Sequence, residues 1–269
     1  QLNIETLSDL PFFKILEELT LGKYQKFRNI IQNNKKELFS NLDFLILQEE
    51  FRKLINKIYL NKSKKSFKIL NVTSTINSEG KSIITILISK FLADFGYKVL
   101  VIDADMRFPF LHKILGFKNE RGLSEILSDG ELNWKDCIIN IYNQQNLFLL
   151  TAGNKNEDPP ILLNSKNLDN LIEDLQTSKE FDYILFDSPG LLGISDSNSL
   201  INKIDNVLFI VSLNFVEIFS VKKAINLLSN TNCNLIGIIS NKNSINRGSI
   251  FKNEYLYFFK KENKYIDTK

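Results

Sequence analysis

The sequence predicts an α/β protein with a doubly wound, mainly parallel sheet and helices on both faces. Short apolar runs alternate with segments of helical periodicity, and strands that run in one direction need such crossovers between them. The apolar runs also lack the polar alternation of a strand with one wet face, which is typical of strands buried on both sides. The 269 residues fit one large domain with an extension, or two small domains.

Composition argues against several classes of function. The net charge is +3, with acidic and basic residues interleaved, so nothing demands a nucleic-acid partner. Cys137 and Cys233 lie far apart, which argues against a zinc site, an iron–sulfur scaffold or a disulfide framework and fits a reducing compartment. His112 is the only histidine, so a His-based triad or metal site is not expected.

The lengths of the apolar runs indicate whether this chain could span a membrane. No run of 18 uncharged apolar residues occurs, so we expect this chain itself to be soluble. It begins with Gln1 and has no signal-peptide pattern, which suggests a piece of a longer protein.

The elements before the main sheet are predicted as follows. A turn at 8–11 leads into a short strand or helix, and the polar residues 23–37 are expected to be exposed. Between Leu42 and Leu60 apolar residues recur at helical spacing, which predicts an amphipathic helix. The polar stretch 61–66 indicates a linker into the main domain.

The main domain then alternates strand and helix. Strands are predicted at 67–72, 98–102, 147–150, 183–186, 207–211 and 235–239. Helices are predicted at 82–95, 122–128, 166–177, 196–203 and 216–229. The helix at 82–95 is closed by Gly96.

A phosphate-binding loop is predicted at 74–82, between the first of these strands and the helix that follows. This is the context of a Walker A loop, in which backbone N–H groups and a helix N-terminus surround phosphates. Lys81 would bring its charge to the β- and γ-phosphates, and the Ser82 hydroxyl would bind Mg²⁺. The predicted nucleotide-binding residues are Asn77, Ser78, Glu79, Gly80, Lys81, Ser82 and Ile83.

Three carboxylates accompany this loop. Asp103 and Asp105 end a predicted strand, and residues two apart in a strand face the same side. Asp187 ends the apolar run 183–186, in the form of a Walker B motif. Ligands in such sheets bind at the carboxyl ends of strands, and phosphoryl transfer needs carboxylates for Mg²⁺ and for the attacking hydroxyl. We therefore expect a P-loop NTPase fold that binds ATP and Mg²⁺; the alternative is turn or cap chemistry at these residues.

With these motifs, the sequence resembles the bacterial tyrosine kinases of the capsule and exopolysaccharide family from about Leu10 to Asn241. These are P-loop ATPases related to division and partition ATPases. The family's second Walker motif, Asp-x-Asp-x-Arg-x-Pro, is complete from Asp103 through Arg107 to Pro109. Further segments that resemble the family lie at 121–127, 150–153, 159–163, 187–189 and 195–196.

The sequence also departs from the family pattern. Thr75 replaces the first glycine of the loop, Asn77-Ser78 its usual Pro-Gly, and Gly190 the second proline of the Walker B motif. Partition ATPases carry a signature lysine where this chain has Ile76, which disfavours a partition function.

The resemblance assigns roles to individual residues. Lys81, Asp103 and Asp105 would be catalytic, with Asp103 as the base toward a tyrosine hydroxyl, whose pKa of about 10 calls for such help. The metal would be held by Ser82, Asp105 and Asp187. Asn241 matches the family's adenine-contacting asparagine, and the alternative is a turn residue at a strand end.

The resemblance also implies a setting. Family members assemble into rings through a Glu-x-x-Arg-x-x-Arg helix, of which Glu49 and Arg52 are present and the last Arg is Ile55. The segment that begins at Asp9 resembles the join to an upstream transmembrane chain-length or activator module. The implied partners are other copies of the chain, that module, a tyrosine phosphatase and the polysaccharide export machinery, at the cytoplasmic face of the inner membrane.

The C-terminal tail carries Tyr255, Tyr257 and Tyr265, and the family ends in a tyrosine cluster that a neighbouring subunit phosphorylates. The alternative is an aromatic helix packed on the core. We thus expect an N-terminal segment (1–40), a kinase domain (41–245) with an oligomerisation helix at 42–60, and a tail (246–269).

Three functions are consistent with these features. The first is an ATP-dependent protein-tyrosine autokinase that regulates capsular or exopolysaccharide synthesis and export. The second is a nucleotide-binding assembly module with little kinase activity, favoured by Ile55 and the sparse tail tyrosines. The third, a partition-type ATPase, is weakened by Ile76.

Overall fold

The computed structural model describes residues 6–11, 24–32, 42–64, 67–154, 158–193, 196–213 and 215–243. Its strands are β1 (Thr6–Pro11), β2 (Ile69–Ser74), β3 (Val99–Asp103), β4 (Ile139–Asn140), β5 (Leu147–Leu150), β6 (Tyr183–Asp187), β7 (Asn206–Ser212) and β8 (Asn234–Asn243). They form one sheet in the order β1-β8-β7-β2-β6-β3-β5-β4. All neighbours pair in parallel except β4 and β5.

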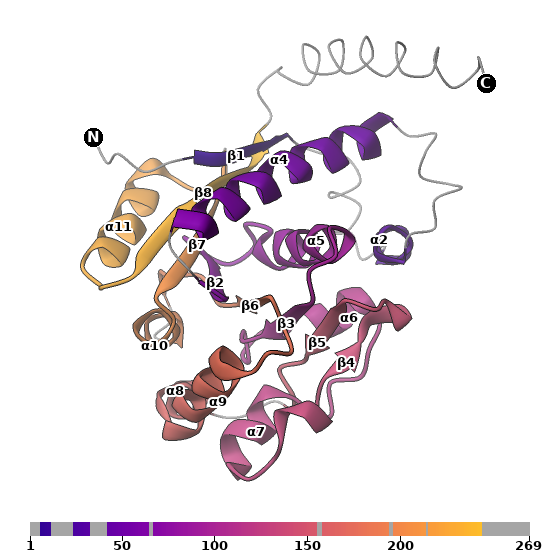
Figure 1. The fold of residues 1–269 in the computed structure, drawn as a ribbon. Helices are drawn as coiled ribbons and strands as arrows, with labels where there is room; N and C mark the ends of the chain where they lie inside the picture. Colours follow the sequence, from indigo (N-terminus) through magenta and orange to yellow (C-terminus); the bar gives the residue numbers. More distant parts are fainter. Residues whose placement is uncertain are drawn as a thin grey trace, which may run out of the picture.

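The α-helices are α2 (Tyr24–Ile31), α4 (Leu42–Lys64), α5 (Lys81–Asp94), α6 (Leu111–Leu115), α7 (Leu123–Asp129), α8 (Pro159–Asn164), α9 (Lys166–Thr177), α10 (Asp196–Lys203) and α11 (Ile218–Ser229). Short 3-10 turns occur at Trp134–Asp136 and Ile141–Asn143. In Figure 1, α4 and α5 lie on one side of the sheet, and α7, α8 and α9 lie on the other. The predicted α/β class, with helices on both faces, is confirmed.

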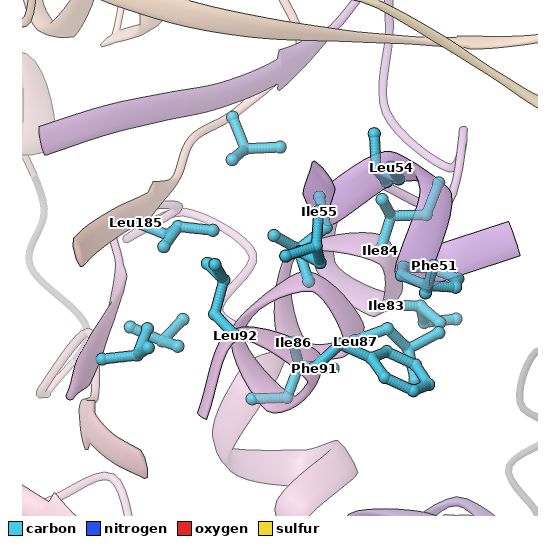
Figure 2. Close-up of a cluster of buried hydrophobic side chains, with 14 of the residues drawn as sticks. Phe51, Leu54, Ile55, Ile83, Ile84, Ile86, Leu87, Phe91, Leu92 and Leu185 are labelled. Atoms are coloured by element: carbon cyan, nitrogen blue, oxygen red, sulfur yellow. The ribbon is translucent and has the colours of Figure 1, made fainter. Parts of the chain in front are cut away.

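Burial explains why the central strands are continuous apolar runs. Every residue of β2, β3 and β6 is buried, because helices cover both faces of the sheet. Helix α5 is buried from Lys81 to Ala93, since it lies between the sheet and α4. Figure 2 shows this layer, where side chains of α4 and α5 interdigitate. Its aromatic contact is a stacked pair, Phe51 and Phe91, with ring centroids 5.1 Å apart.

Three predictions about the N-terminal part are wrong. Residues 8–11 belong to a strand, because β1 adds to the edge of the sheet beside β8. The segment 23–37 is not simply exposed, since α2 buries Phe27, Ile30 and Ile31. The expected linker at 61–66 is helical as far as Lys64, because α4 continues through it.

The parallel arrangement gathers the chemistry at one edge. Because parallel strands end at the same side of the sheet, the segments after β2, β3, β6 and β7 meet there, beside the carboxyl end of β8. None of the helices in the described part of the chain has the length and hydropathy to span a bilayer.

Candidate active site at the carboxyl ends of β2, β3 and β6

The loop after β2 has two residues in the left-handed region. Gly80 has φ 89°, as a glycine readily does, and Ser78 has φ 70°. Ser78 stands where the resembling family has glycine, so this departure costs about 1 kcal/mol of backbone strain. Lys81 and Ser82 follow directly as the first residues of α5, the position the sequence predicts for them.

Two departures from the family pattern touch each other beneath this loop. A Cβ atom at Gly190 would lie 2.6 Å from the carbonyl carbon of Ile76. The Gly190 N–H donates to Asn77 Oδ1 at 3.3 Å, which a proline at 190 could not do. Glycine at 190 therefore lets the segment after β6 run directly against the phosphate loop.

Lys81 is a buried cation. Its Nζ lies 3.2 Å from Asp105 Oδ2, and both side chains are less than a tenth exposed. Burial alone would lower the pKa of Lys81, but the Asp187, Asp105 and Asp103 carboxylates outweigh it and raise that pKa. The structure thus brings the predicted lysine and the three predicted carboxylates into one cluster.

Asp103 has one satisfied oxygen and one free one. Oδ2 accepts the backbone N–H groups of Phe110 (3.1 Å) and Leu111 (3.0 Å), at the start of α6. Oδ1 is buried without a hydrogen-bond partner. Burial and the nearby Asp187 carboxylate raise the pKa of Asp103 to about 8, so this carboxyl can hold a proton near neutral pH.

Asp187 lies beside Asp103, since the two are paired in the register of β6 and β3. Its Oδ1 is 3.5 Å from the Thr85 hydroxyl, and its Oδ2 is buried with no partner. Burial raises the pKa of Asp187 to about 6, against the lowering effects of Lys81 and Ser82.

The donor atoms of this cluster determine whether it could hold a metal ion. Within the described residues, no group of three or more His, Cys, Asp or Glu side chains could hold a metal by itself. A P-loop magnesium site has a different composition, with one or two carboxylates, a hydroxyl, water and phosphate oxygens. The unpartnered Oδ2 of Asp187 and the nearby Ser82 fit that donor set.

Arg107 of the second Walker motif takes a role that sequence reasoning missed. Its guanidinium binds Asp196 through two bonds, Nε to Oδ2 at 2.7 Å and Nη2 to Oδ1 at 3.1 Å. Asp196 is 1% exposed and opens α10, and the neighbouring Ser197 hydroxyl donates to the Pro189 carbonyl at 3.0 Å. Arg107 thereby holds α10 and the segment after Asp187 in place. Both Arg107 and Asp196 lie in segments that resemble the family, and this resemblance was the sequence signal that could have indicated the pair.

Asn241 is 4% exposed, lies in β8 and contacts the phosphate loop. Its Nδ2 donates to the Glu79 carbonyl at 2.8 Å and lies 2.5 Å from where a Gly80 Cβ would be. Its predicted contact with adenine stays a prediction.

The residues predicted for assembly lie on α4. Glu49 and Arg52 form a half-exposed ion pair at 3.6 Å, whereas Ile55 is 2% exposed in the core. Tyr255, Tyr257 and Tyr265 lie outside the described residues.

Known proteins with related sequences settle the family. The ParA family, described as NUBPL iron-transfer P-loop NTPase, matches residues 66–268. The tyrosine-protein kinase CpsD of Streptococcus pneumoniae serotype 4 is 32% identical over 204 residues, which cover 75% of this chain and 87% of CpsD. The chain belongs to the bacterial tyrosine-protein kinases, a group with the P-loop NTPase fold.

Two further comparisons, one of sequence and one of structure, extend this result. The tyrosine-protein kinase etk of Escherichia coli K12 is 24% identical over 246 residues, which cover 88% of this chain but 33% of etk. The crystal structure of the chimerical protein CapA2B2 superposes with a TM-score of 0.73 at 26% identity, covering 90% of this chain and 96% of that one. The similarity in sequence and fold thus extends over most of the chain.

Proposed function

We propose that this protein is an ATP-dependent tyrosine autokinase that phosphorylates tail tyrosines of neighbouring copies and so regulates capsular or exopolysaccharide synthesis and export. The observation that supports it is the buried cluster of Lys81 with Asp103, Asp105 and Asp187 beside a phosphate loop. The relationship to CpsD gives independent support.

The cluster suits phosphoryl transfer. The loop amides and Lys81 would bind the triphosphate, and Lys81 would exchange its Asp105 partner for phosphate oxygens. Mg²⁺, when held by Ser82, Asp105 and Asp187, would neutralise charge on the phosphates. Asp103 would accept the proton of a tyrosine hydroxyl through its unpartnered Oδ1 as the oxygen attacks the γ-phosphorus and the bond to ADP breaks.

The setting is part of the same proposal. Etk is about three times as long as the matched region, which agrees with a membrane module upstream of the kinase. We accordingly place this chain at the inner face of the plasma membrane, as a kinase domain at 41–245 with a tail at 246–269. Glu49 and Arg52 on α4 would contact a neighbouring copy in a ring.

Incubation with Mg·ATP followed by mass spectrometry tests the activity. Phosphotyrosine is expected at one or more of Tyr255, Tyr257 and Tyr265, and both Lys81→Met and Asp103→Asn should abolish it. Triple Tyr→Phe replacement at the tail is the matched control, since it should remove the phosphate while leaving ATP binding intact. Oligomeric protein that binds ATP but gains no tail phosphate would contradict the kinase function.

That outcome would favour the second candidate, a nucleotide-binding assembly module of polysaccharide export with little transfer. Two observations favour it: the strained Ser78 in the loop and the buried Ile55 in the assembly motif.

A further inference from the structure

Glu79 is a buried acid in the phosphate loop that phosphoryl transfer does not use. Its side chain is fully buried, and its two oxygens accept different backbone N–H groups. Oε1 accepts from Ile76 at 2.8 Å, within the loop, and Oε2 accepts from Ser212 at 2.7 Å. Because Ser212 is the last residue of β7, one carboxylate joins the loop to a neighbouring strand.

The backbone of Glu79 is also hydrogen-bonded, to a residue of β8, the strand next to β7. Its carbonyl accepts Asn241 Nδ2 at 2.8 Å, and the Asn241 carbonyl in turn accepts the Leu213 N–H at 2.8 Å. Asn241 belongs to β8 and pairs with Ser212 in the sheet register. The loop is therefore anchored to the ends of both β7 and β8, on the side of β2 away from Asp103 and Asp187.

This anchoring would keep the loop in a fixed arrangement before a ligand binds. Phosphate binding requires several N–H groups to converge, and two residues here have positive φ to achieve it. A loop ordered before the ligand arrives avoids the entropic cost of ordering upon binding. Burial raises the pKa of Glu79, and the hydrogen bonds from Ser212 and Ile76 work against that rise by stabilising its charge.

We propose that Glu79 is a positioning residue, whose side chain holds the phosphate loop in its binding shape by joining the Ile76 and Ser212 amides. The proposal rests on the proposed function, because it concerns how the nucleotide is bound. Only a carboxylate of this reach accepts both amides, since a side-chain amide offers one acceptor and one donor group.

The test is Glu79→Gln, which keeps the volume and removes one acceptor. Titration calorimetry should show Mg·ATP and Mg·ADP binding weakened roughly tenfold, the size of a lost hydrogen bond to a charged group. The KM for ATP should rise in the same proportion, while kcat at saturating ATP stays within about twofold of wild type, because bound phosphates restore the loop.

Glu125→Gln is the matched control. Glu125 also joins two backbone amides, those of Gly122 (2.7 Å) and Asn154 (3.0 Å), although it is less buried. Glu125 belongs to α7, and its partner Asn154 follows β5, three strands along the sheet from β2, or about 14 Å. This variant should lose stability but keep wild-type affinity for Mg·ATP.

The outcomes separate the two proposals. If wild-type protein binds Mg·ATP and Glu79→Gln binds within twofold of it, the positioning role is wrong and the kinase function stands. If wild-type protein does not bind Mg·ATP, the proposed function itself fails. Should Glu79→Gln not fold, amide exchange in nucleotide-free wild type decides: the Ile76 and Ser212 amides should exchange slowly, and fast exchange at both would overturn the role.

Discussion

At the scale of single residues, the main feature of the site is its buried charge. One ammonium faces three carboxylates in a place that excludes water, so the free protein does not keep all three ionised at neutral pH. With its pKa raised to about 8, Asp103 is the group of the three that retains a proton in the nucleotide-free protein. Nucleotide and metal would change this balance, because they bring further charge into the cluster.

The raised pKa of Asp103 predicts a pH dependence of stability in the nucleotide-free protein. The unfolded state releases this proton near pH 4, whereas the folded state keeps it to about pH 8. The unfolding free energy should therefore be greatest below pH 4 with respect to this group and should fall as the pH rises to 8. Asp187 adds a fall that ends near pH 6.

Chemical denaturation at pH 6, 7 and 8 measures this slope. Asp103→Asn, which mimics the protonated acid, should flatten the slope, whereas Asp129→Asn at the exposed end of α7 should keep it. Equal slopes in the wild type and Asp103→Asn would contradict the proton on Asp103.

At the scale of elements, periodicity and motifs located the central strands and main helices to within a few residues. The helix 166–177 is as predicted, and β6 extends only one residue beyond its prediction. Strand β1 was missed because its alternation is weak and its burial depends on β8, more than 220 residues away in sequence. Helix α6 was missed because it is one turn long, and a side chain, Asp103, binds its first amides.

The candidate site, like the fold, could be predicted from the sequence only in part. Local motifs predicted Lys81, Asp103, Asp105 and Asp187 together, since Lys81 begins a helix, Asp103 and Asp187 end strands, and Asp105 lies two residues after Asp103. The Arg107–Asp196 pair and the Glu79 bridge join segments 89 and 133 residues apart, and no local pattern encodes such contacts.

Helix α4 offers a prediction at this scale. Ile55 stands where the family's assembly motif has its last arginine, and it packs against α5, as Figure 2 shows. Ile55→Arg would place an unpaired charge in the core and should lower the unfolding free energy by about 3 kcal/mol or more.

Its matched control is Asn56→Arg, one residue along on the exposed face, which should change stability by less than about 0.5 kcal/mol. Both are measured by urea denaturation. If Ile55→Arg is as stable as the wild type, the packing of α4 on α5 is wrong.

At the scale of the whole molecule, the sheet order places the N-terminal strand β1 beside β8, the strand that contacts the phosphate loop. Strand β1 pairs with β8, and Asp9 lies opposite Ser240, one residue before Asn241. Asn241 in turn contacts the phosphate loop. Strand β1 is therefore joined to the phosphate loop through β8, because β1 pairs with β8 and Asn241 of β8 donates to the Glu79 carbonyl.

The proposed activity requires that the cluster around Lys81 binds Mg·ATP. Calorimetric titration of the wild type and Lys81→Met with ATP, with and without Mg²⁺, tests it most directly. We predict saturable binding of one nucleotide per chain that requires Mg²⁺ for full affinity and weakens by roughly 10- to 100-fold in Lys81→Met. No binding by folded wild-type protein, or equal binding by the two proteins, would contradict it.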